Sequence, residues 1–371
     1  MVSALKASAS FEDAGAVLSV SLSALKSNYR LLADRAAPAR CGASVKADAY
    51  GLGAGPVAQA LAGEGCRDFF LAHPAEAERL VGAVPPEARL FVLNGLPPGA
   101  ESHAASLPKL VPVLNSMAQA EAWAREAVRQ GRRLPAALHV DTGMSRLGVS
   151  AREALLLQGD GCFDRLDLQL VMSHLASAED ESAASNGRQL ERFAAVRARF
   201  AGVPASFANG SGVFLGRRYA FDLVRPGAAL YGLNPHGDRS NPMRPVLRLS
   251  APVIQTRVIE AGVPVGYGGT FTAARAMPAA TIAIGYGDGW PRRAGLAGFF
   301  EGARLPMVGR ISMDTAVIDC SALGSRFLQP GDHVELLCEK QTSDQVAEAC
   351  GTIGYEILTG IGARVRRNYL L

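Results

Sequence analysis

A single lysine near the start of the chain lies where an amine can do covalent chemistry. Lys46 ends the apolar run Ala43–Val45 and is followed four residues later by Tyr50 and then by several glycines. Partial burial lowers the pKa of an amine, and a neutral amine is nucleophilic enough to form a Schiff base with an aldehyde such as pyridoxal phosphate. The alternative is a strand-end lysine whose ammonium reaches water along its alkyl stem. The residues alone leave both interpretations open.

The sequence around this lysine resembles the cofactor-lysine motif of the alanine racemases. The segment that carries the resemblance is Val45–Gly51, and other motifs similar to those of the family follow in the family's order. These motifs are His139–Gly148, Ser173–His174, Asn209–Ser211, Arg225–Gly227, Gly266–Gly268, Gly285–Gly289, Arg310–Asp314 and Tyr355–Glu356. The resemblance extends from about Val17 to the C-terminus, and the ordered set is more specific than any one of its members.

Between about residues 40 and 230 the chain alternates short apolar runs with alanine-rich stretches of helical period. The apolar runs predict strands at Ala43–Val45, Phe69–Ala72, Leu90–Leu93, Leu110–Val113, Ala137–Val140 and Leu168–Met172. The helices predicted between them are Gly55–Ala62, Ala75–Val81, Ser116–Arg129, Ala151–Gln158 and Ser185–Phe200. Regular alternation of strand and helix indicates a parallel α/β sheet, and this number of units favours a closed (β/α)8 TIM-type barrel over an open doubly wound sheet.

The pattern of the sequence changes after about Leu247, where short β-rich runs are separated by glycine and proline. These runs predict a mostly antiparallel β domain with strands at Val253–Val258, Thr281–Ile284, Leu305–Val308, Thr315–Ile318 and His333–Leu337. We therefore expect residues 1–246 to form the barrel and residues 247–371 to form the β domain. The resemblance implies in addition that the first strand, at about residues 14–21, joins the C-terminal domain.

Several residues that can move protons fall at the carboxyl ends of the predicted barrel strands, where the active sites of this fold lie. Lys46, Arg146 and His174 all lie at or just beyond such ends. The residues alone favour a structural histidine at 174 and an ordinary loop residue for Tyr267, which stands between glycines. The resemblance implies instead that Lys46 and Tyr267 are the two catalytic bases. A tyrosine with a pKa near 10 is a poor base at neutral pH, so Arg146 and His174 would tune it.

The resemblance also implies a set of residues that bind pyridoxal 5'-phosphate. Arg225 would contact the pyridine nitrogen, and because arginine stays protonated it would leave that nitrogen unprotonated and weaken the ring as an electron sink. Return of the proton to Cα is then favoured over transamination or decarboxylation. Without the resemblance, a surface salt bridge is the expected role of Arg225. The other residues implied to bind the cofactor are Lys46, Tyr50, Ser211, Gly227, Ala228 and Tyr355.

Substrate binding and the entrance are implied to involve both domains. Arg146 and the backbone N–H of Met313 would bind the substrate carboxylate, although a core methionine is the alternative for Met313. Tyr286 and Asp314 would line the entrance. In the family the counterparts of Tyr267, Met313 and Asp314 come from the second subunit, so the resemblance implies a homodimer with shared active sites.

One position departs from the family pattern. Many members carry a lysine modified by carbon dioxide at the place of His139, where it holds the arginine that contacts substrate. Histidine cannot form that stable carbamate. We expect either that another anion positions Arg146 or that His139 does so through a different contact.

Composition and charge exclude several function classes. The 371 residues carry a net charge of +4 from 38 basic and 34 acidic residues, and because the basic residues are scattered we expect no nucleic-acid partner. The basic cluster Arg364, Arg366 and Arg367 is interpreted as a solvated tail. The six cysteines show neither metal-type spacing nor a disulfide framework, so we expect reduced thiols in a cytoplasmic protein without a metal. The segment Ala14–Leu25 lacks the basic start of a secretory signal, and no stretch has the length of a transmembrane helix, so no membrane partner is expected.

The sequence therefore predicts an enzyme similar to the alanine racemases, which interconverts L-alanine and D-alanine by a two-base mechanism and supplies D-alanine for peptidoglycan. An amino-acid racemase of broader specificity is the nearest alternative, because pocket width depends on distances that a sequence does not contain. A decarboxylase built on the same barrel typically pairs the pyridine nitrogen with a carboxylate, and Arg225 argues against it. A cofactor carrier without turnover would need neither a second base nor the C-terminal domain.

Overall fold

The structure is a computed structural model that describes residues 15–237, 239–293 and 295–371. These residues form two compact units. The barrel unit comprises Leu22–Arg244, and the β unit comprises Pro245–Leu371 together with the segment from residue 15 to Ser21. Each unit has its own sheet and its own core.

The barrel unit is built on parallel strands that follow one another in sequence order. Its main sheet has the order β3-β4-β5-β6-β7-β8-β9, and β2 pairs in parallel with β10. A bridge between Asn209 and Arg225 and a hydrogen bond from Ser44 N to Pro226 O join the last strands to the first. The strands are β2 (Arg40–Cys41), β3 (Ala43–Ser44), β4 (Asp68–Leu71), β5 (Arg89–Val92), β6 (Leu110–Leu114), β7 (Leu134–His139), β8 (Leu166–Met172), β9 (Ala205–Ser206) and β10 (Leu223–Val224).

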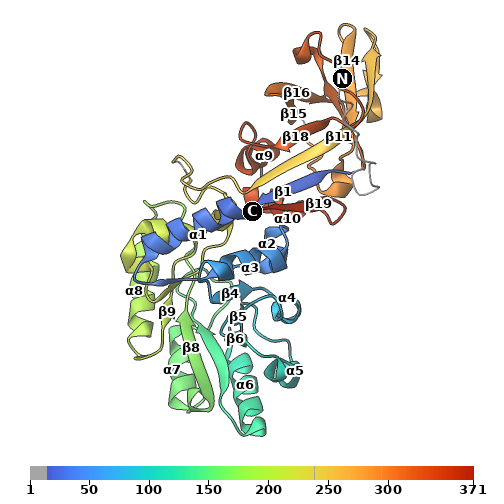
Figure 1. Ribbon diagram of the computed structural model, residues 1–371. Helices are drawn as coiled ribbons and strands as arrows, with labels where there is room; N and C mark the ends of the chain where they lie inside the picture. The colour runs from blue at the N-terminus through green and yellow to red at the C-terminus, as the bar shows by residue number, and fades with distance from the viewer. Residues whose placement is uncertain (1–14, 238, 294) are drawn as a thin grey trace. The chain divides into compact units, whose positions relative to one another are not determined.

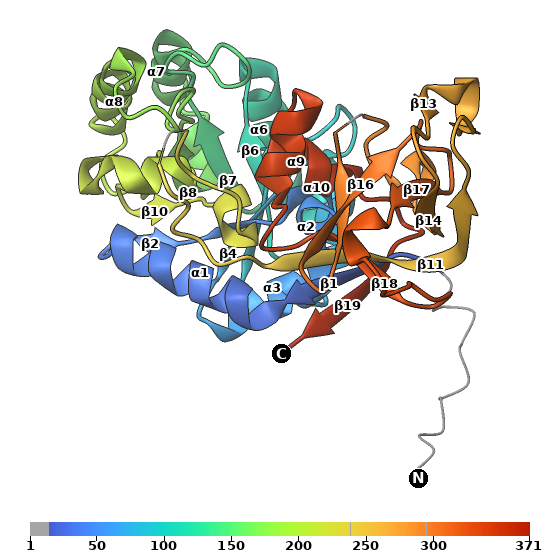
Figure 2. The same cartoon turned by 90° about the horizontal axis from the view of Figure 1, so that it is seen from above.

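Helices lie around the outside of these strands (Figures 1 and 2). Ser116 begins one of them by accepting a hydrogen bond from Gln119 N at 3.2 Å, and Gly131 ends it in the left-handed region. The helices of this unit are α1 (Leu22–Ala36), α2 (Lys46–Tyr50), α3 (Ala54–Gly63), α4 (Pro74–Leu80), α5 (Glu101–Ser106), α6 (Met117–Gln130), α7 (Ala151–Gly159) and α8 (Ala184–Arg197). Alternation of these helices with the strands gives the predicted barrel.

The inside of the barrel is a packed apolar core. Phe70 and Phe91 stack with their ring centroids 4.8 Å apart. Strands covered on both faces need continuous apolar runs, which is why the predicted strands read as such runs rather than as an alternating pattern. The predicted TIM-type barrel is confirmed, and the open doubly wound alternative is wrong. The core residues come from successive strands and include Phe70, Phe91, Val111, Val113, Ala137, Leu170, Met172 and Leu223.

The β unit contains an eight-stranded sheet with the order β14-β17-β16-β15-β18-β11-β1-β19. The first strand, β1 (Val17–Ser21), pairs antiparallel with β11 (Leu247–Ile259) and parallel with β19 (Arg366–Leu370), and Figure 2 shows these strands side by side. Residue 14, where the predicted first strand begins, lies outside the described residues. The other strands are β12 (Pro264–Val265), β13 (Phe271–Thr272), β14 (Met277–Ile282), β15 (Ala297–Phe300), β16 (Ala303–Val308), β17 (Ala316–Asp319) and β18 (His333–Leu337).

The C-terminal segment differs from the prediction of a solvated basic tail. Arg366 and Arg367 begin β19, which is paired with β1. The Arg367 guanidinium donates to three backbone carbonyls, those of Ile361, Gly362 and Val365. That interpretation of the cluster is wrong because charge density alone does not indicate whether a segment has a strand to pair with. Two helices, α9 (Ser343–Cys350) and α10 (Gly354–Gly360), precede this strand and were not predicted.

None of the helices in the described ranges is long and apolar enough to cross a membrane. Glu12 and Asp13, which precede the apolar segment considered as a secretory signal, lie outside the described ranges.

Candidate functional site

The carboxyl ends of the barrel strands carry a layer of buried polar side chains. Burying a polar group is costly unless it is hydrogen-bonded, so such a layer marks a place where the interior is used for more than packing. The members are Ser44 at the end of β3, Asn115 after β6, His139 at the end of β7, Ser173 after β8, Ser206 at the end of β9 and Arg225 after β10.

Lys46 lies at this end of the barrel, directly after β3. The strand end is fixed on two sides, because Val45 N donates to Phe70 O at 2.9 Å and the Tyr231 hydroxyl donates to Ser44 O at 2.8 Å. Burial lowers the pKa of the Lys46 amine, the positive charge of Arg146 lowers it further, and Glu76 opposes both effects. An amine with a lowered pKa, held at a fixed strand end, favours the nucleophilic interpretation of this residue over the solvated one.

The turn that follows Lys46 is left-handed. Ala47, Asp48 and Ala49 have φ between 53° and 54° and ψ between 47° and 50°, and Tyr50 has φ 57°. Each such residue with a side chain costs about 1–2 kcal/mol relative to the right-handed region, so a run of them must be stabilised by its surroundings. Asp48 contributes by accepting a hydrogen bond from Ala54 N at 2.7 Å. The run was not predicted, because alanine has no preference for this conformation.

Arg225 is buried and held by three partners. Its guanidinium donates to Ser206 Oγ at 2.5 Å, to Ser173 O at 2.6 Å and to His174 Nδ1 at 3.2 Å. Burial lowers the pKa of Arg225 to about 9, which still leaves the side chain charged at neutral pH. The surface salt bridge considered for this residue from sequence alone is wrong. A rigid buried cation suits recognition of a single neutral acceptor, such as the nitrogen of a heterocycle.

The buried His139 and the partly buried His174 are held in opposite tautomers. Asn115 directs its amide nitrogen to Leu93 O and Val113 O at 2.9 and 3.0 Å, so its Oδ1 faces His139 Nδ1 at 2.8 Å and that nitrogen must carry the proton. Arginine has no acceptor, so His174 Nδ1 must be the unprotonated nitrogen in its contact with Arg225. His139 therefore offers an acceptor at Nε2, and His174 offers a donor at Nε2.

Both rings are neutral at physiological pH. Burial lowers the pKa of His139 to about 4, and the charges of Arg225 and Arg146 contribute to this. Burial also places the pKa of His174 well below its usual value, with further lowering by Arg225 and Arg146. A neutral imidazole with one donor and one acceptor can fix hydrogen-bond directions without adding charge to the site.

The pKa of His139 predicts a pH dependence of stability. Between pH 6.5 and about 4 the unfolded chain binds a proton at this residue that the folded chain does not bind, so stability falls as pH falls through this window and the contribution is fully present above it. The difference corresponds to about 3 kcal/mol. In His139→Gln the thermal midpoint should fall less steeply over this window than in the wild type, in scans at fixed protein concentration. Parallel curves for the two proteins would contradict the neutral buried ring.

Arg146 is presented by a loop that leaves and rejoins the end of β7. Val149 N donates to His139 O at 2.9 Å, and this closes the loop at its base. Inside the loop the Asp141 carboxylate accepts hydrogen bonds from the backbone N–H groups of Gly143, Met144 and Ser145 at 2.9–3.1 Å. Partial burial would raise the pKa of Asp141, but these bonds outweigh it and the pKa lies below its usual value. The exposed Arg146 is thus carried on an ordered loop.

Tyr50, four residues after Lys46, forms a close contact with Gly227. The Tyr50 ring lies against Tyr231, with centroids 4.8 Å apart, and its hydroxyl lies so near Gly227 that an added Cβ there would collide with it. Ala228 begins the 3₁₀ turn η5 (Ala228–Tyr231), and Ser211 begins η3 (Ser211–Leu215). Backbone N–H groups at turn starts beside a phenol can bind an oxyanion. These residues fit the phosphate end of pyridoxal phosphate, and Lys46 and Arg225 fit its aldehyde and ring nitrogen.

Gly227→Ala tests this contact. A Cβ added at Gly227 would collide with the Tyr50 hydroxyl and would also lie 3.1 Å from Tyr50 Cζ and 3.3 Å from Ser44 Cβ, so the new methyl group should displace the Tyr50 ring. We expect a roughly 10- to 100-fold loss of pyridoxal phosphate affinity, as is typical when a preorganised polar group is lost from a site. Gly187→Ala is the matched control, because a Cβ there meets nothing within 4 Å. Equal affinity in both variants, measured by titration of cofactor fluorescence, would remove Tyr50 and Gly227 from the site.

The β unit carries the remaining predicted residues. Tyr267 begins the 3₁₀ turn η6 (Tyr267–Gly269) between β12 and β13, which pair in a hairpin, and its side chain is 67% exposed. The preceding Gly266 has φ 70°, and an added Cβ there would lie 3.3 Å from Arg310 O. The glycine is therefore needed for the turn to approach the neighbouring backbone. An aromatic residue on such a tip is presented outward from its own unit.

Two loops of the β unit are joined where the predicted entrance and substrate residues lie. Tyr286 N donates to Ser312 O at 3.1 Å, and Gly287 N donates to Met313 O at 2.8 Å. Arg364 bridges the loops through Asp288 Oδ1 at 2.9 Å and Asp314 Oδ1 at 2.8 Å. Tyr286, Met313 and Asp314 are thus brought together, and Met313 is 53% exposed. A plain core methionine, the sequence alternative, is therefore wrong.

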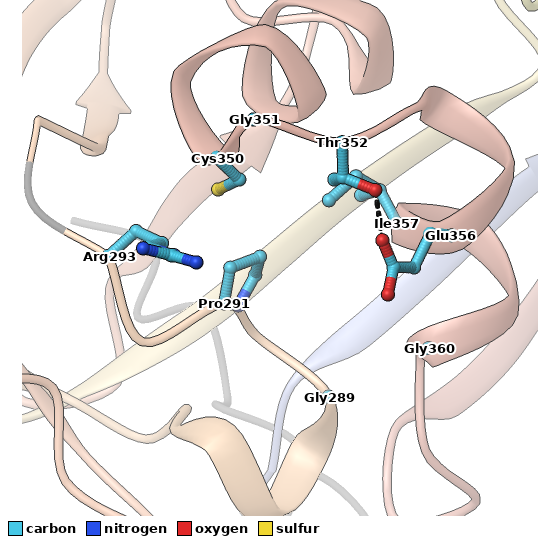
Figure 3. A pocket seen from close by; sticks show the side chains of 9 residues that line it. All are labelled: Gly289, Pro291, Arg293, Cys350, Gly351, Thr352, Glu356, Ile357 and Gly360. Atoms are coloured by element: carbon cyan, nitrogen blue, oxygen red, sulfur yellow. Dashed lines mark hydrogen bonds between the residues drawn. The ribbon is translucent and has the colours of Figure 1, made fainter.

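Tyr355 lies in the first turn of α10, within the β unit, and is also exposed. A pocket of about 380 Å³ lies near the same helix, and Figure 3 shows Arg293 and Cys350 on one side of it and the Thr352–Glu356 pair on the other. None of the predicted site residues lines this pocket. The predicted site residues that lie in the barrel unit are Lys46, Tyr50, Arg146, His174, Ser211, Arg225, Gly227 and Ala228, and those that lie in the β unit are Tyr267, Tyr286, Met313, Asp314 and Tyr355.

Several residues that organise the site were not predicted. Asn115 directly follows an apolar strand, as Lys46 does, and this position was a usable signal. Glu76 stands three residues after His73 with Pro74 between them, the pattern of a helix start. Nothing in the local sequence marks Ser206 as a partner of Arg225 or Arg364 as a bridge between two aspartates, because these contacts join distant segments.

Comparison with known proteins agrees with this geometry along the whole chain. The family model described as alanine racemase, N-terminal domain, matches residues 20–235, and the one described as alanine racemase, C-terminal domain, matches residues 246–369. A relative named catabolic alanine racemase from Mesorhizobium japonicum is 49% identical over 96% of this chain and 94% of its own length. An alanine racemase of Brucella canis is 47% identical, again with 96% and 94% covered.

A solved structure gives the same result for the fold. The crystal structure of alanine racemase from Bartonella henselae with covalently bound pyridoxal phosphate is similar with a TM-score of 0.91 and 42% identity, covering 96% of this chain and all of the other. The two family models together match most of the sequence. The chain belongs to the alanine racemase family, whose members are pyridoxal-phosphate-dependent isomerases.

Proposed function

We propose that this protein interconverts L-alanine and D-alanine with pyridoxal 5'-phosphate as its cofactor. The observation that carries the proposal is the presence of two basic side chains, the partly buried Lys46 and the buried Arg225, at one end of the barrel. Lys46 has a lowered amine pKa at a fixed strand end, and Arg225 is held by Ser206, Ser173 and His174. One of these groups suits a Schiff base and the other suits a ring nitrogen, and both are needed for racemisation through this cofactor.

The bound cofactor supplies an electron sink that acidifies the Cα proton of the amino acid attached to it. Lys46 holds the cofactor aldehyde, Arg225 contacts the ring nitrogen, and Tyr50, Ser211, Gly227, Ala228 and Tyr355 bind the phosphate end. Arg225 would keep its charge beside the ring nitrogen, leave that nitrogen without a proton and so weaken the ring as an electron sink. That argues for return of the proton to Cα and against a decarboxylase.

Two bases on opposite faces of Cα move the proton. The Lys46 amine would serve one face, and the Tyr267 hydroxyl would serve the other. The phenol must lose its proton to act as a base, so it needs nearby donors and cations, which His174 Nε2–H and Arg146 provide. Each base returns a proton when the reaction runs in the other direction.

The active form is a homodimer in which Tyr267, Met313 and Asp314 of each subunit complete the site of the other. Tyr267 and Met313 are 67% and 53% exposed, and exposed aromatic and methionine side chains are typical of surfaces that meet a partner. Arg146 and the Met313 backbone N–H bind the substrate carboxylate, and Tyr286 and Asp314 line the entrance.

His139 takes over the positioning of Arg146 without a carbamate. It offers a neutral acceptor at Nε2, because Asn115 fixes the proton on Nδ1. An arginine N–H can donate to such a nitrogen, so the family's modified lysine is not needed for orientation, although its negative charge is lost. Activity should accordingly be insensitive to removal of carbon dioxide from the buffer.

The setting we propose is the cytoplasm, which suits the six free cysteines. D-alanine supply for peptidoglycan is the proposed role. The relatives from Mesorhizobium japonicum and Rhizobium johnstonii are named catabolic, so breakdown of D-alanine is the alternative use of the same reaction.

Chiral chromatography of reactions with L-alanine or L-serine tests the proposal. Purified protein with pyridoxal phosphate should convert L-alanine to an equal mixture of enantiomers and convert L-serine much more slowly. Equal action on serine would establish the broad-specificity racemase instead. Release of carbon dioxide without inversion would establish a decarboxylase and overturn the proposal.

A further inference from the structure

Glu76 connects the turn after Lys46 to the start of a neighbouring helix. Its Oε1 accepts a hydrogen bond from Ala47 N, the first backbone N–H after the lysine, at 2.6 Å. Its Oε2 accepts from Ala72 N at 2.6 Å and from His73 N at 2.9 Å. One partly buried carboxylate thus joins the segment after β3 to the segment after β4.

A helix cap accounts for only half of these contacts. Glu76 is the third residue of α4, and the bond from its side chain to the backbone of the residue before the helix is the usual capping arrangement. That arrangement needs Oε2 alone. The bond from Ala47 N uses the other oxygen and reaches 29 positions back along the chain. Charge-assisted bonds of this kind are short and directional, so they can hold a backbone conformation that is otherwise unfavourable.

The held conformation is the one that aims Lys46. Ala47 is the first residue of the left-handed run, with φ 53° and ψ 47°, and its N–H belongs to the peptide that carries the Lys46 carbonyl. If this peptide rotated, the direction of the lysine side chain would change. Two charged side chains shift the pKa of the Lys46 amine: Arg146 lowers it and Glu76 raises it. Among the described residues that shift this pKa, Glu76 is therefore the only one of opposite charge to the lysine.

We propose that Glu76 is a positioning residue for Lys46, which fixes the peptide after the lysine in its left-handed turn and stabilises the protonated form of the lysine nitrogen. The proposal rests on the function proposed above, in which Lys46 holds the cofactor and moves a proton at Cα. Glu76 itself touches neither substrate nor cofactor.

Glu76→Gln separates the two halves of the contact. Glutamine serves in a capping box as glutamate does, so its oxygen can keep the cap of α4. Its NH2 group then faces the Ala47 N–H, and two donors cannot bond. Glu153→Gln is the matched control, because Glu153 occupies the same position in the capping box of α7 and accepts from Ser150 N at 2.7 Å.

We expect kcat for alanine to fall roughly 10- to 100-fold in Glu76→Gln with little change in KM, because misplacing a catalytic group affects the chemical step. The pH at which the holoenzyme loses the visible absorbance of the lysine-bound cofactor should fall by roughly half a unit or more, because an opposite charge has been removed. Glu153→Gln should show neither change. Glu76→Asp, which keeps the charge but has a shorter arm, should keep the absorbance pH profile while losing turnover.

A purely structural cap makes a different set of predictions. It would lower the thermal midpoint of Glu76→Gln and Glu153→Gln alike and leave kcat and the absorbance profile of both at wild-type values, and this result would overturn the proposal. If the wild type bound cofactor without racemising alanine, the proposed function would fail, while the absorbance profile of Glu76→Gln would still decide whether Glu76 acts on Lys46. If Glu76→Gln did not fold, Glu76→Asp with wild-type turnover would overturn the positioning role.

Discussion

Lys46→Ala is expected to abolish racemisation and to remove the visible absorbance of the lysine-bound cofactor. The residue combines two roles in this account, since it anchors the cofactor covalently and serves one face of Cα. Loss of a general base alone typically costs 10²- to 10⁴-fold, and loss of the covalent anchor adds to this, so the turnover number should fall by roughly 10⁴-fold or more. The absorbance spectrum and chiral analysis of the products measure the two losses separately.

Lys26→Ala is the control for this variant, because Lys26 lies on the helix α1 and no role in the site is assigned to it. It should keep both the absorbance and the activity of the wild type. Racemisation by Lys46→Ala at more than one hundredth of the wild-type rate would show that another residue carries the chemistry. In that case the lowered pKa of the lysine would be a consequence of burial without a catalytic use.

Tyr267→Phe is expected to retain the cofactor and to lose racemisation by roughly 10²- to 10⁴-fold. The substitution removes only the hydroxyl from an exposed side chain, so neither folding nor the cofactor absorbance should change. The two enantiomers have equal free energy in water, so kcat/KM must fall by the same factor in both directions. The rate of Cα proton exchange need not be equal for the two enantiomers. It can therefore report on the two faces of Cα separately.

In heavy water the variant should still exchange the Cα proton of D-alanine, which we assign to Lys46, and should lose exchange for L-alanine, which we assign to Tyr267. Nuclear magnetic resonance of each enantiomer separately gives the two rates. Equal loss of exchange for both enantiomers would indicate that the hydroxyl acts on the cofactor or the fold. Wild-type racemisation would exclude Tyr267 as a base.

The barrel could be predicted well because both of its signals are local. Strands buried on two faces need apolar runs such as Leu110–Val113, and the amphipathic helices between them keep their own period. The short strands β9 and β10 were not predicted, since two residues each give no pattern. In the β unit, α9 and β19 were missed, because the pairing of β19 with β1 joins the two ends of the described chain and leaves no local trace.

The candidate site likewise contains residues that the local sequence indicates and contacts that it does not indicate. Lys46, Arg146 and His174 could be placed from their positions after predicted strands, and their combination with Tyr267 and Arg225 came from the ordered motifs. The tautomers of His139 and His174 could not be predicted, because they depend on Asn115 and Arg225, each distant in sequence. The local sequence around Glu76 indicated only its role in the cap of α4. Its bond to Ala47 depends on the left-handed turn, and no propensity of alanine indicates that turn.

Deuterium transfer at Cα during a single conversion of L-alanine tests the two-base account most directly. With wild-type protein in heavy water at low conversion, the account predicts that D-alanine carries deuterium at Cα from the first turnover, since its proton comes from the base on the opposite face. Recovered L-alanine should contain much less. D-alanine that kept the original Cα proton would show that one base serves both faces, and the roles assigned to Lys46 and Tyr267 would then be wrong.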